Sequence, residues 1–174
     1  YAYLRAANDS AYTNVFTNCT YSGDIKMIGS FANRSTIGGL IGYNSANYIT
    51  LDNCHTTGNI IFENYYSAGD VTNYVAVGGF FGYDGQEVEY KSLCTSSMNL
   101  AVSGHCKATN PLYVGGIVGW DARNDANRFN AMNVKNSGKI TIGKKDATTT
   151  VNSLLVGGIV GKITNSAACT GYEN

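Results

Sequence analysis

Two aspartates at corresponding positions of a repeated motif are the first candidates for chemistry in this 174-residue chain. Asp84 and Asp121 each follow an aromatic residue, in "VGGFFGYD" and "VGGIVGWD". A close pair of carboxylates can share a proton, separate its two pKa values and cleave a glycosidic bond as acid and base. No third acid, basic residue or histidine falls in register with the pair. We therefore expect two solvated turn residues and no catalysis.

The aromatic residues before these positions form a second candidate site. Tyr43, Tyr83 and Trp120 follow three copies of the motif, and the fourth copy continues with Lys162. Stacked copies would bring the rings into a ladder. A structural stack worth about 0.5–1.5 kcal/mol per ring pair is the favoured interpretation. The alternative is a platform that packs on sugar rings, with the neighbouring Asn and Asp side chains binding hydroxyl groups.

Cysteine and histidine are the remaining reactive residue types. His55 adjoins Cys54 and His105 adjoins Cys106, but the two pairs lie about 50 residues apart. A metal site needs three or four converging ligands, and neighbours in a strand point to opposite faces. We predict no metal. The chain also lacks a Ser/His/Asp or Cys/His constellation and a phosphate-binding loop, so we predict no cofactor and no enzyme activity.

The motif itself recurs four times and organises the chain. "IGGLIG" begins at residue 37, "VGGFFG" at 77 and "VGGIVG" at 114 and 156, which are 40, 37 and 42 residues apart. We call these segments the glycine tags. A second element, Asn-Cys followed by Gly-x-Ile-x-apolar, falls in step with them. Self-similarity at this period is typical of stacked repeat architectures.

Each repeat contains three short strand-like pieces, and the last shows the clearest alternation. Its inward pairs are Ile25/Met27, Ile60/Phe62, Leu100/Val102 and Ile140/Ile142. Because similar residues recur at equivalent positions, stacking the repeats places like on like. The sequence predicts an all-β fold, a parallel β-solenoid (β-helix) of about four coils plus a partial fifth. A β-sandwich is the alternative, but it requires no constant spacing of the tags.

We expect a single repeat domain over residues 1–174, with about 40 residues in each coil. The predicted coils are approximately 1–36, 37–76, 77–113, 114–155 and a partial 156–174.

The alignment also predicts columns of equivalent side chains. The cysteine column comprises Cys19, Cys54, Cys94 and, after an interruption at Val134, Cys169. It forms either a reduced, buried column of small apolar groups or a Cys19–Cys54 disulfide, with a local bridge from Cys94 to Cys106. A second column contains Tyr21, Thr56, Ser96 and Asn136. This column is not a regular threonine array, which argues against binding to ice.

The tags "IGGLIGY", "VGGFFGY" and "VGGIVGW", each in step with the Asn-Cys element, resemble GLUG-type repeats. These occur in long secreted and cell-surface proteins such as bacterial adhesins. The resemblance covers about residues 17–169 and implies a β-helical stalk or adhesive segment rather than a catalytic domain. The chain departs from the pattern at Met98, where a glycine belongs, and at Val134, which replaces the cysteine.

Composition favours an extracellular or cell-surface location. The five cysteines suggest an oxidising compartment, and N-glycosylation sequons occur at Asn8, Asn18 and Asn33. A net charge of zero with 14% charged residues argues against nucleic acid as a partner. No apolar run approaches the roughly 18 residues of a membrane-spanning helix. Glycans remain an alternative partner.

Both ends of the chain are expected to fall within a repeat. Residues 3–19 overlay residues 38–54 without a gap, which places Arg5 at the position of Leu40. Uncapped coils present unpaired strand edges, and head-to-tail stacking of such edges need not close. We therefore expect a structural or adhesive protein that self-associates into a fibre or stalk. The alternative is a carbohydrate-binding or degenerate polysaccharide-active β-helix.

Overall fold

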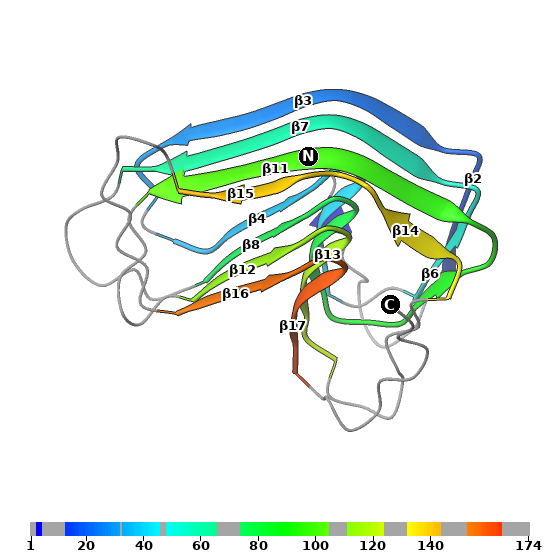
Figure 1. Ribbon diagram of the computed structural model, residues 1–174. Coiled ribbons are helices and arrows are strands. Elements are labelled where there is room, and N and C mark those ends of the chain that lie inside the picture. Colours follow the sequence, from blue (N-terminus) through cyan, green and yellow to red (C-terminus); the bar gives the residue numbers. More distant parts are fainter. Residues whose placement is uncertain are drawn as a thin grey trace.

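The computed structural model describes residues 3–4, 13–31, 33–45, 48–65, 74–104, 111–123, 132–143 and 153–164. Within these ranges the chain forms strands and turns, with no helix. The strands belong to four parallel sheets, which the chain visits in the same order in each of its first three coils (Figure 1).

The four sheets are named here in the order in which the chain enters them. Sheet A contains β1 (Tyr3–Leu4), β5 (Ile41–Asn44), β9 (Phe81–Asp84), β13 (Val118–Asp121) and β17 (Val160–Ile163). Sheet B contains β2 (Thr13–Thr17), β6 (Tyr48–Asp52) and β10 (Val88–Tyr90). Sheet C contains β3 (Thr20–Gly29), β7 (His55–Asn64), β11 (Cys94–Gly104), β14 (Val134–Asn136) and β15 (Ile140–Ile142). Sheet D contains β4 (Ser35–Gly38), β8 (Val75–Gly78), β12 (Leu112–Gly115) and β16 (Leu154–Gly157).

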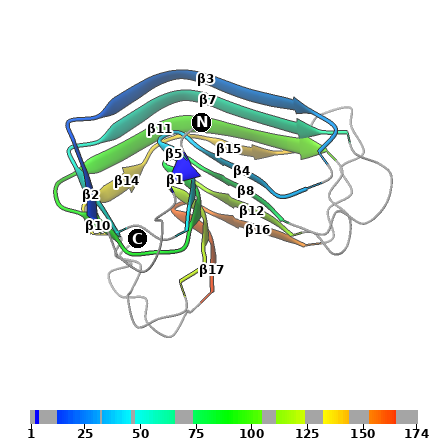
Figure 2. The same cartoon turned by 180° about the vertical axis from the view of Figure 1, so that it is seen from behind.

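Successive coils stack in register, as both ribbon views show (Figures 1 and 2). Ile25 pairs with Ile60, Ile60 with Leu100, and Leu100 with Ile140. The predicted parallel β-solenoid of about four coils with a partial fifth is confirmed. Each complete coil has four strands rather than the expected three, because each glycine tag bends in its middle and contributes one strand to sheet D and one to sheet A.

The tag glycines are required for space at this bend, which we call the arch. A Cβ on Gly82 would lie 2.4 Å from the backbone nitrogen of Ile37, on the other arm of the arch. A Cβ on Gly79 would lie 2.2 Å from the carbonyl oxygen of Gly116 in the next coil. Real Cβ contacts do not occur at such distances, so glycine alone lets the arms meet and the coils stack.

The asparagines of the Asn-Cys element mark a second bend, between sheets B and C. Asn18, Asn53 and Asn133 have φ angles of 55°, 53° and 62°. Asparagine tolerates this left-handed conformation better than most residues with a side chain. The Asn-Cys pair therefore combines a turn residue with an inward-facing one.

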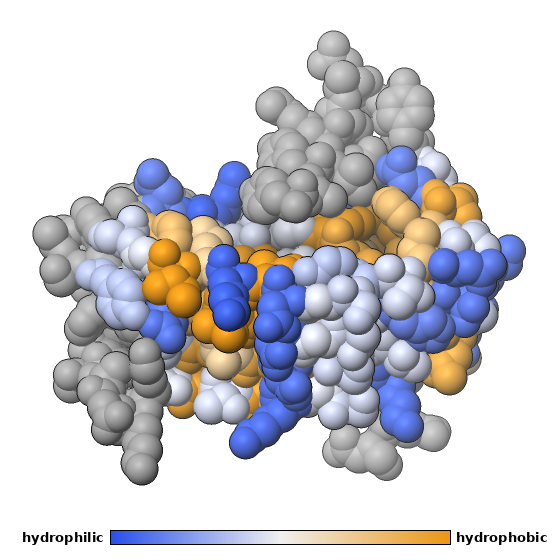
Figure 3. All heavy atoms as spheres, turned by 90° about the horizontal axis from the view of Figure 1, so that it is seen from above, coloured by the Kyte–Doolittle hydropathy of each residue, from blue (hydrophilic) through white to orange (hydrophobic). Residues whose placement is uncertain are grey.

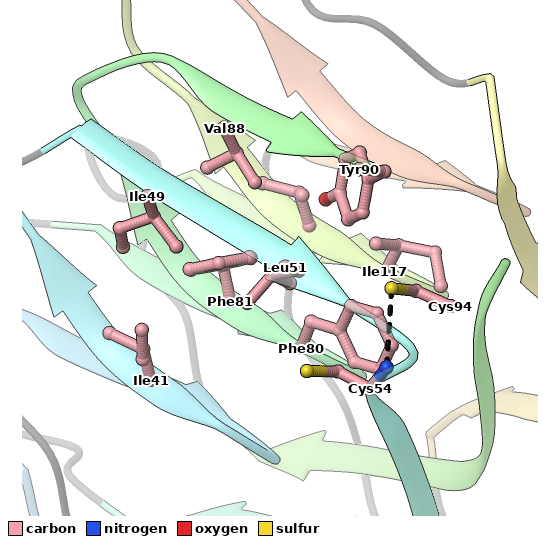
Figure 4. Close-up of a cluster of buried hydrophobic side chains, with 11 residues drawn as sticks. Ile41, Ile49, Leu51, Cys54, Phe80, Phe81, Val88, Tyr90, Cys94 and Ile117 are labelled. Carbon is pink, nitrogen blue, oxygen red and sulfur yellow. Dashed lines mark hydrogen bonds between the residues drawn. The ribbon is translucent and has the colours of Figure 1, made fainter. Parts of the chain in front are cut away.

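Two apolar cores fill the coil. The first lies beside sheets A and B (Figure 4) and contains Ile41, Ile49, Leu51, Cys54, Phe80, Phe81, Val88, Tyr90, Cys94, Ile117 and Val118. The second lies between sheets C and D and contains Ile37, Ile60, Phe62, Val75, Val77, Met98, Leu100, Val102, Leu112 and Val114. Met98 lies in register with Gly58 and is fully buried, so this departure from the repeat pattern adds a side chain to the core.

The first coil differs from its predicted alignment. Tyr3 pairs with Tyr43 rather than with Gly38, whereas Thr13 pairs with Tyr48 as the overlay of residues 3–19 on 38–54 requires. The gap-free overlay is therefore wrong for β1, and Arg5, which it aligned with Leu40, lies outside the described residues. The connection between β1 and β2 is longer than that between β5 and β6, since the turns between paired strands accommodate insertions that the ladders do not.

Candidate functional site

The three aromatic residues of the predicted ladder lie side by side. Tyr43, Tyr83 and Trp120 occupy one register position of β5, β9 and β13. The Tyr43 and Tyr83 rings are stacked, with centroids 4.6 Å apart and an interplanar angle of 16°. Trp120 meets Tyr83 edge-on at 5.2 Å. The sequence correctly predicted this column, which we call the aromatic ladder.

Two further tyrosines join the ladder from the sheet D side of the arch. Tyr74 precedes β8 and contacts Trp120 edge-on, with ring centroids 4.3 Å apart. Tyr113 belongs to β12 and lies 5.2 Å from Trp120. Together the five rings fill the angle between the two arms of the arch. Sequence reasoning missed both tyrosines, although each lies within three residues before the start of a tag.

A cation lies at each end of the aromatic ladder. The guanidinium carbon of Arg34 lies 4.4 Å from the centre of the Tyr43 ring. At the other end Lys162, in register with Trp120, places Nζ 4.3 Å from the Trp120 ring and donates a hydrogen bond to the Tyr113 hydroxyl at 3.0 Å. Cation–π contacts of this kind contribute about 0.5–1 kcal/mol each at exposed sites.

The ladder geometry determines which ring surfaces a ligand meets. Tyr43 lies between Arg34 and Tyr83, and Lys162 covers Trp120. Sugar rings pack on open aromatic faces, and here the faces are turned toward other rings or cations. A glycan bound at Tyr43, Tyr83 and Trp120 would first have to displace one of the cations. Burial also raises the pKa of Tyr74 and of Tyr83, so both hydroxyls stay protonated at neutral pH.

The residue after each aromatic side chain points into the molecule. Asn44, Asp84 and Asp121 share one register position and are 0%, 0% and 2% exposed. Asn44 Nδ2 donates to Asp84 Oδ1 at 2.8 Å. The expectation of solvated turn residues is therefore wrong. These aspartates end a strand, and neighbouring side chains of a strand face opposite sides.

Arg123 completes this buried polar column. Its Nε donates to Asp121 Oδ1 at 2.8 Å and its Nη2 to Asp121 Oδ2 at 2.5 Å, with both side chains 2% exposed. No basic residue shares the register position of the two acids, but Arg123, which sequence reasoning missed, supplies the counter-charge from two residues further along the chain. The spacing "DAR" contained the signal, because residues two apart on an extended chain share a face.

Asp84 is the titratable group of the column. Its burial raises the pKa of the carboxyl to about 7, and the nearby Arg123 guanidinium opposes this shift. Oδ2 of Asp84 has no hydrogen-bond partner within the part of the chain that the structure describes. The carboxyl is fully buried, so the Asp84–Asp121 pair does not reach a polysaccharide in this conformation.

The cysteine column follows the predicted register. Cys19, Cys54 and Cys94 are free thiols, and Cys94 pairs with Val134. The Cys54 backbone nitrogen donates to Cys94 Sγ at 3.4 Å (Figure 4). This arrangement matches the reduced alternative for these three residues, with Cys54 and Cys94 buried and Cys19 partly exposed. Burial raises the pKa of Cys54 and of Cys94, which disfavours reactive thiolates. Cys106 and Cys169 lie outside the described residues.

Two of the predicted glycosylation sites are placed by the structure. Asn18 and Asn33 are exposed, whereas Asn8 lies outside the described ranges. Asn18 Oδ1 accepts a hydrogen bond from Asn53 Nδ2 at 2.7 Å. Glycosylation of these residues stays a prediction.

Metal-binding residue types do not gather in the described part of the chain, where no group of three or more His, Cys, Asp and Glu could hold an ion. His55 engages both ring nitrogens, with Thr95 Oγ1 at 2.8 Å and Asn53 Oδ1 at 2.9 Å. The described residues also contain no helix that is long and apolar enough to cross a bilayer.

The two end surfaces of the stack form a further candidate site. At the β3 end a hollow of about 470 Å³ lies between sheet C and the arch. Its lining includes Tyr21, Ile25, Met27, Ile37 and Leu40. Figure 3 looks onto this end and shows hydrophobic side chains bordered by hydrophilic ones. At the opposite end three apolar side chains of β16 are exposed, namely Leu154, Leu155 and Val156, at 40%, 44% and 46%.

Comparisons with models of known protein families, with curated proteins and with solved structures find no match to this chain. The resemblance to GLUG-type repeats therefore remains an interpretation of the tags themselves. The fold and the contacts within it carry the functional argument that follows.

Proposed function

We propose that this chain is a structural segment of an extracellular fibre or stalk, whose end coils stack on further coils of the same kind. The observation that supports it is the state of the two end surfaces. Within the described residues β4 pairs only with β8, and β16 only with β12. The β16 edge exposes apolar side chains, whereas Ser35, Thr36 and Ile37 of β4 are buried beside an apolar hollow. Such edges are templates for further strand pairing.

The internal contacts of the molecule support a structural role over a catalytic one. The ring faces of the aromatic ladder are covered, and the carboxylate pair is buried with Arg123 beside it. Each column joins successive coils and therefore stiffens the stack along its axis. A stalk or adhesive fibre requires this kind of stiffness, whereas an active site requires reacting groups that a substrate can reach.

An extracellular location is supported by the exposed sequon residues and is compatible with the burial of two free thiols. The sequon residues Asn18 and Asn33 lie on the surface, where a glycan can be attached. Cys54 and Cys94 are fully buried, so oxidants of that compartment do not reach them without unfolding.

Electron microscopy and sedimentation velocity of the purified chain over a concentration series test this function. We expect assemblies that lengthen along one axis as the concentration rises. Oriented fibres should give a meridional reflection near about 4.8 Å, the spacing of paired strands. A chain that stays monomeric at every concentration contradicts the self-associating fibre.

A glycan array carried out on the same material addresses the carbohydrate-binding alternative. Specific glycan binding that is lost in Trp120→Ala would favour that alternative.

A further inference from the structure

The outer face of sheet C carries a column of hydrogen-bonded residues, three of them joined through their side chains and the fourth through its backbone nitrogen. Asn59 Nδ2 donates to Asp24 Oδ1 at 2.7 Å, and Asn99 Nδ2 donates to Asn59 Oδ1 at 3.3 Å. The backbone nitrogen of Lys139 donates to Asn99 Oδ1 at 3.1 Å. We call these four residues the asparagine ladder. Like the aromatic ladder, it lies in the register that joins successive coils.

The asparagine ladder ends in opposite charges. Asp24 lies on β3, at the end of the stack that contains the apolar hollow. Lys139 directly precedes β15, at the end that exposes Leu154, Leu155 and Val156. One end surface therefore combines a carboxylate with a hollow, and the other combines an ammonium group with apolar side chains. On sheet C the two end surfaces therefore carry opposite charges, and each end also presents apolar residues.

We propose that two copies of this chain join head to tail so that Lys139 of one copy lies against Asp24 of the next. This inference rests on the proposed function and specifies the residues of its interface. The register is the one that already joins neighbouring coils, so the junction repeats the pairing of β11 with β7 and of β12 with β8. The asparagine ladder then continues from one copy into the next.

The same register avoids like charges along sheet C. The columns that begin at Thr20 and Lys26 reach Lys135 and Thr141 at the other end of the stack. A junction thus places Lys135 against Thr20 and Thr141 against Lys26, with the single opposite pair at Lys139 and Asp24.

Sheet D contributes the apolar part of the junction. If β16 of one copy pairs with β4 of the next in the register of sheet D, Leu155 lies beside Thr36 and Val156 lies beside Ile37. Thr36 and Ile37 line the hollow but are only 7% and 6% exposed, so the surface that this contact removes from water is mainly that of Leu155 and Val156. Burying exposed apolar side chains contributes roughly 25 cal/mol for each Å² removed from water.

Sheet A contributes a competition between two strands. Sheet A has a fifth strand, β17, at one end of the stack. At the junction, β17 of one copy would pair with β5 of the next copy, along the edge of β5 where β1 of that next copy already lies. Four residues of β17 would replace the two residues of β1. This exchange brings Lys162 of one copy to the Tyr43 ring of the next, where Arg34 already lies. The like charges oppose assembly, and removing Arg34 should strengthen it.

The test is the assembly of charge-reversed variants, measured by sedimentation velocity beside the wild-type chain. Lys139→Glu would face Asp24 and Asp24→Lys would face Lys139, so each variant alone should need at least about tenfold more protein to assemble, a difference of about 1.4 kcal/mol. An equimolar mixture restores opposite charges at every junction and should assemble like the wild type. Lys135→Glu, which faces Thr20, is the matched control and should assemble normally. Arg34→Gln should assemble at lower concentration.

The outcomes separate the interface from the function. A wild-type chain that never assembles contradicts the proposed function itself. If the wild type assembles but Lys139→Glu assembles equally well, self-association stands and this register is wrong. A mixture that stays dispersed, although both variants have wild-type far-ultraviolet circular dichroism, also overturns the register.

Discussion

The aromatic ladder and the buried polar column run side by side through sheet A, one residue apart in the sequence. Tyr83 stacks on Tyr43 at the surface, and the next residue, Asp84, accepts a hydrogen bond from Asn44 in the interior. The ladder changes composition along the stack from Tyr43 to Lys162, and each member contacts the next. The polar column instead requires a specific counter-charge, Arg123, at Asp121.

The difference follows from the solvent exposure of the two columns. Ring contacts at a half-exposed surface are individually weak and tolerate several partners. A buried carboxylate loses its hydration and requires a cation, a hydrogen-bond donor or a proton. Adjacent positions of a repeat can therefore differ in their tolerance to substitution, and four predictions can break or sharpen this contrast.

The largest effect is expected for Arg123→Met. This change leaves Asp121 buried without its ion-pair partner and should lower the free energy of unfolding by about 3–5 kcal/mol. Urea denaturation at pH 7 measures it. The double variant Arg123→Met/Asp121→Leu removes both charges and should recover most of the loss. A decrease below about 1 kcal/mol for the single variant would show that the column does not need its cation.

The second prediction concerns pH. The pKa of Asp84 rises from 3.8 in the unfolded chain to about 7 in the folded one, so the folded state holds a proton that the unfolded state releases first. Stability should therefore fall by up to about 4 kcal/mol as the pH rises from about 4 to about 7, and change no further above that. Asp84→Asn should remove this slope and exceed the wild type in stability at pH 8.

Denaturation midpoints measured across the pH range test the prediction. Asp24→Asn removes an exposed carboxylate and should leave the Asp84-dependent slope in place. An equal slope in Asp84→Asn and the wild type would assign the proton to another group.

The third prediction concerns the arch that holds the two columns back to back. Gly79→Ala places its Cβ 2.2 Å from the carbonyl oxygen of Gly116 and should destabilise the fold by about 1–3 kcal/mol or more. Gly158 occupies the same position of the last tag, where a Cβ meets nothing within 4 Å, so Gly158→Ala should have little effect. Thermal unfolding of both variants gives the comparison. Equal effects would mean that contact between coils does not explain why glycine recurs at this position of the tags.

The smallest effects are expected in the aromatic ladder. Tyr83→Leu loses ring contacts with Tyr43, Tyr74 and Trp120 and should lower the free energy of unfolding by about 1–2 kcal/mol. Lys162→Met removes one cation from the ladder end and should lower it by about 0.5–1 kcal/mol. Urea denaturation ranks both against Arg123→Met. A larger loss in Tyr83→Leu than in Arg123→Met would reverse the contrast between the columns.

The columns themselves were predictable, because a parallel stack pairs equivalent positions of the repeat. The alignment placed Thr56 with Tyr21, Ser96 and Asn136, and the structure pairs them in that way. It failed at β1, where only two residues pair and no motif marks the register. Periodicity alone also did not reveal the arch, because the sharp angle between sheets D and A arises from backbone contacts across the tag glycines.

The sequence by itself determined the parallel solenoid, its approximate number of coils and the register of the described columns beyond β1, since a repeat of nearly constant length favours the one register that places like on like. The tertiary structure alone decided which side of the coil each column faces. The arms of the arch enclose Tyr74 and Tyr113 with the aromatic ladder, turn Asp84 and Asp121 inward and bring Arg123 back to Asp121. The physical reason is that repeat spacing constrains pairing along the stack, whereas the angle between sheets depends on contacts between residues that no period relates.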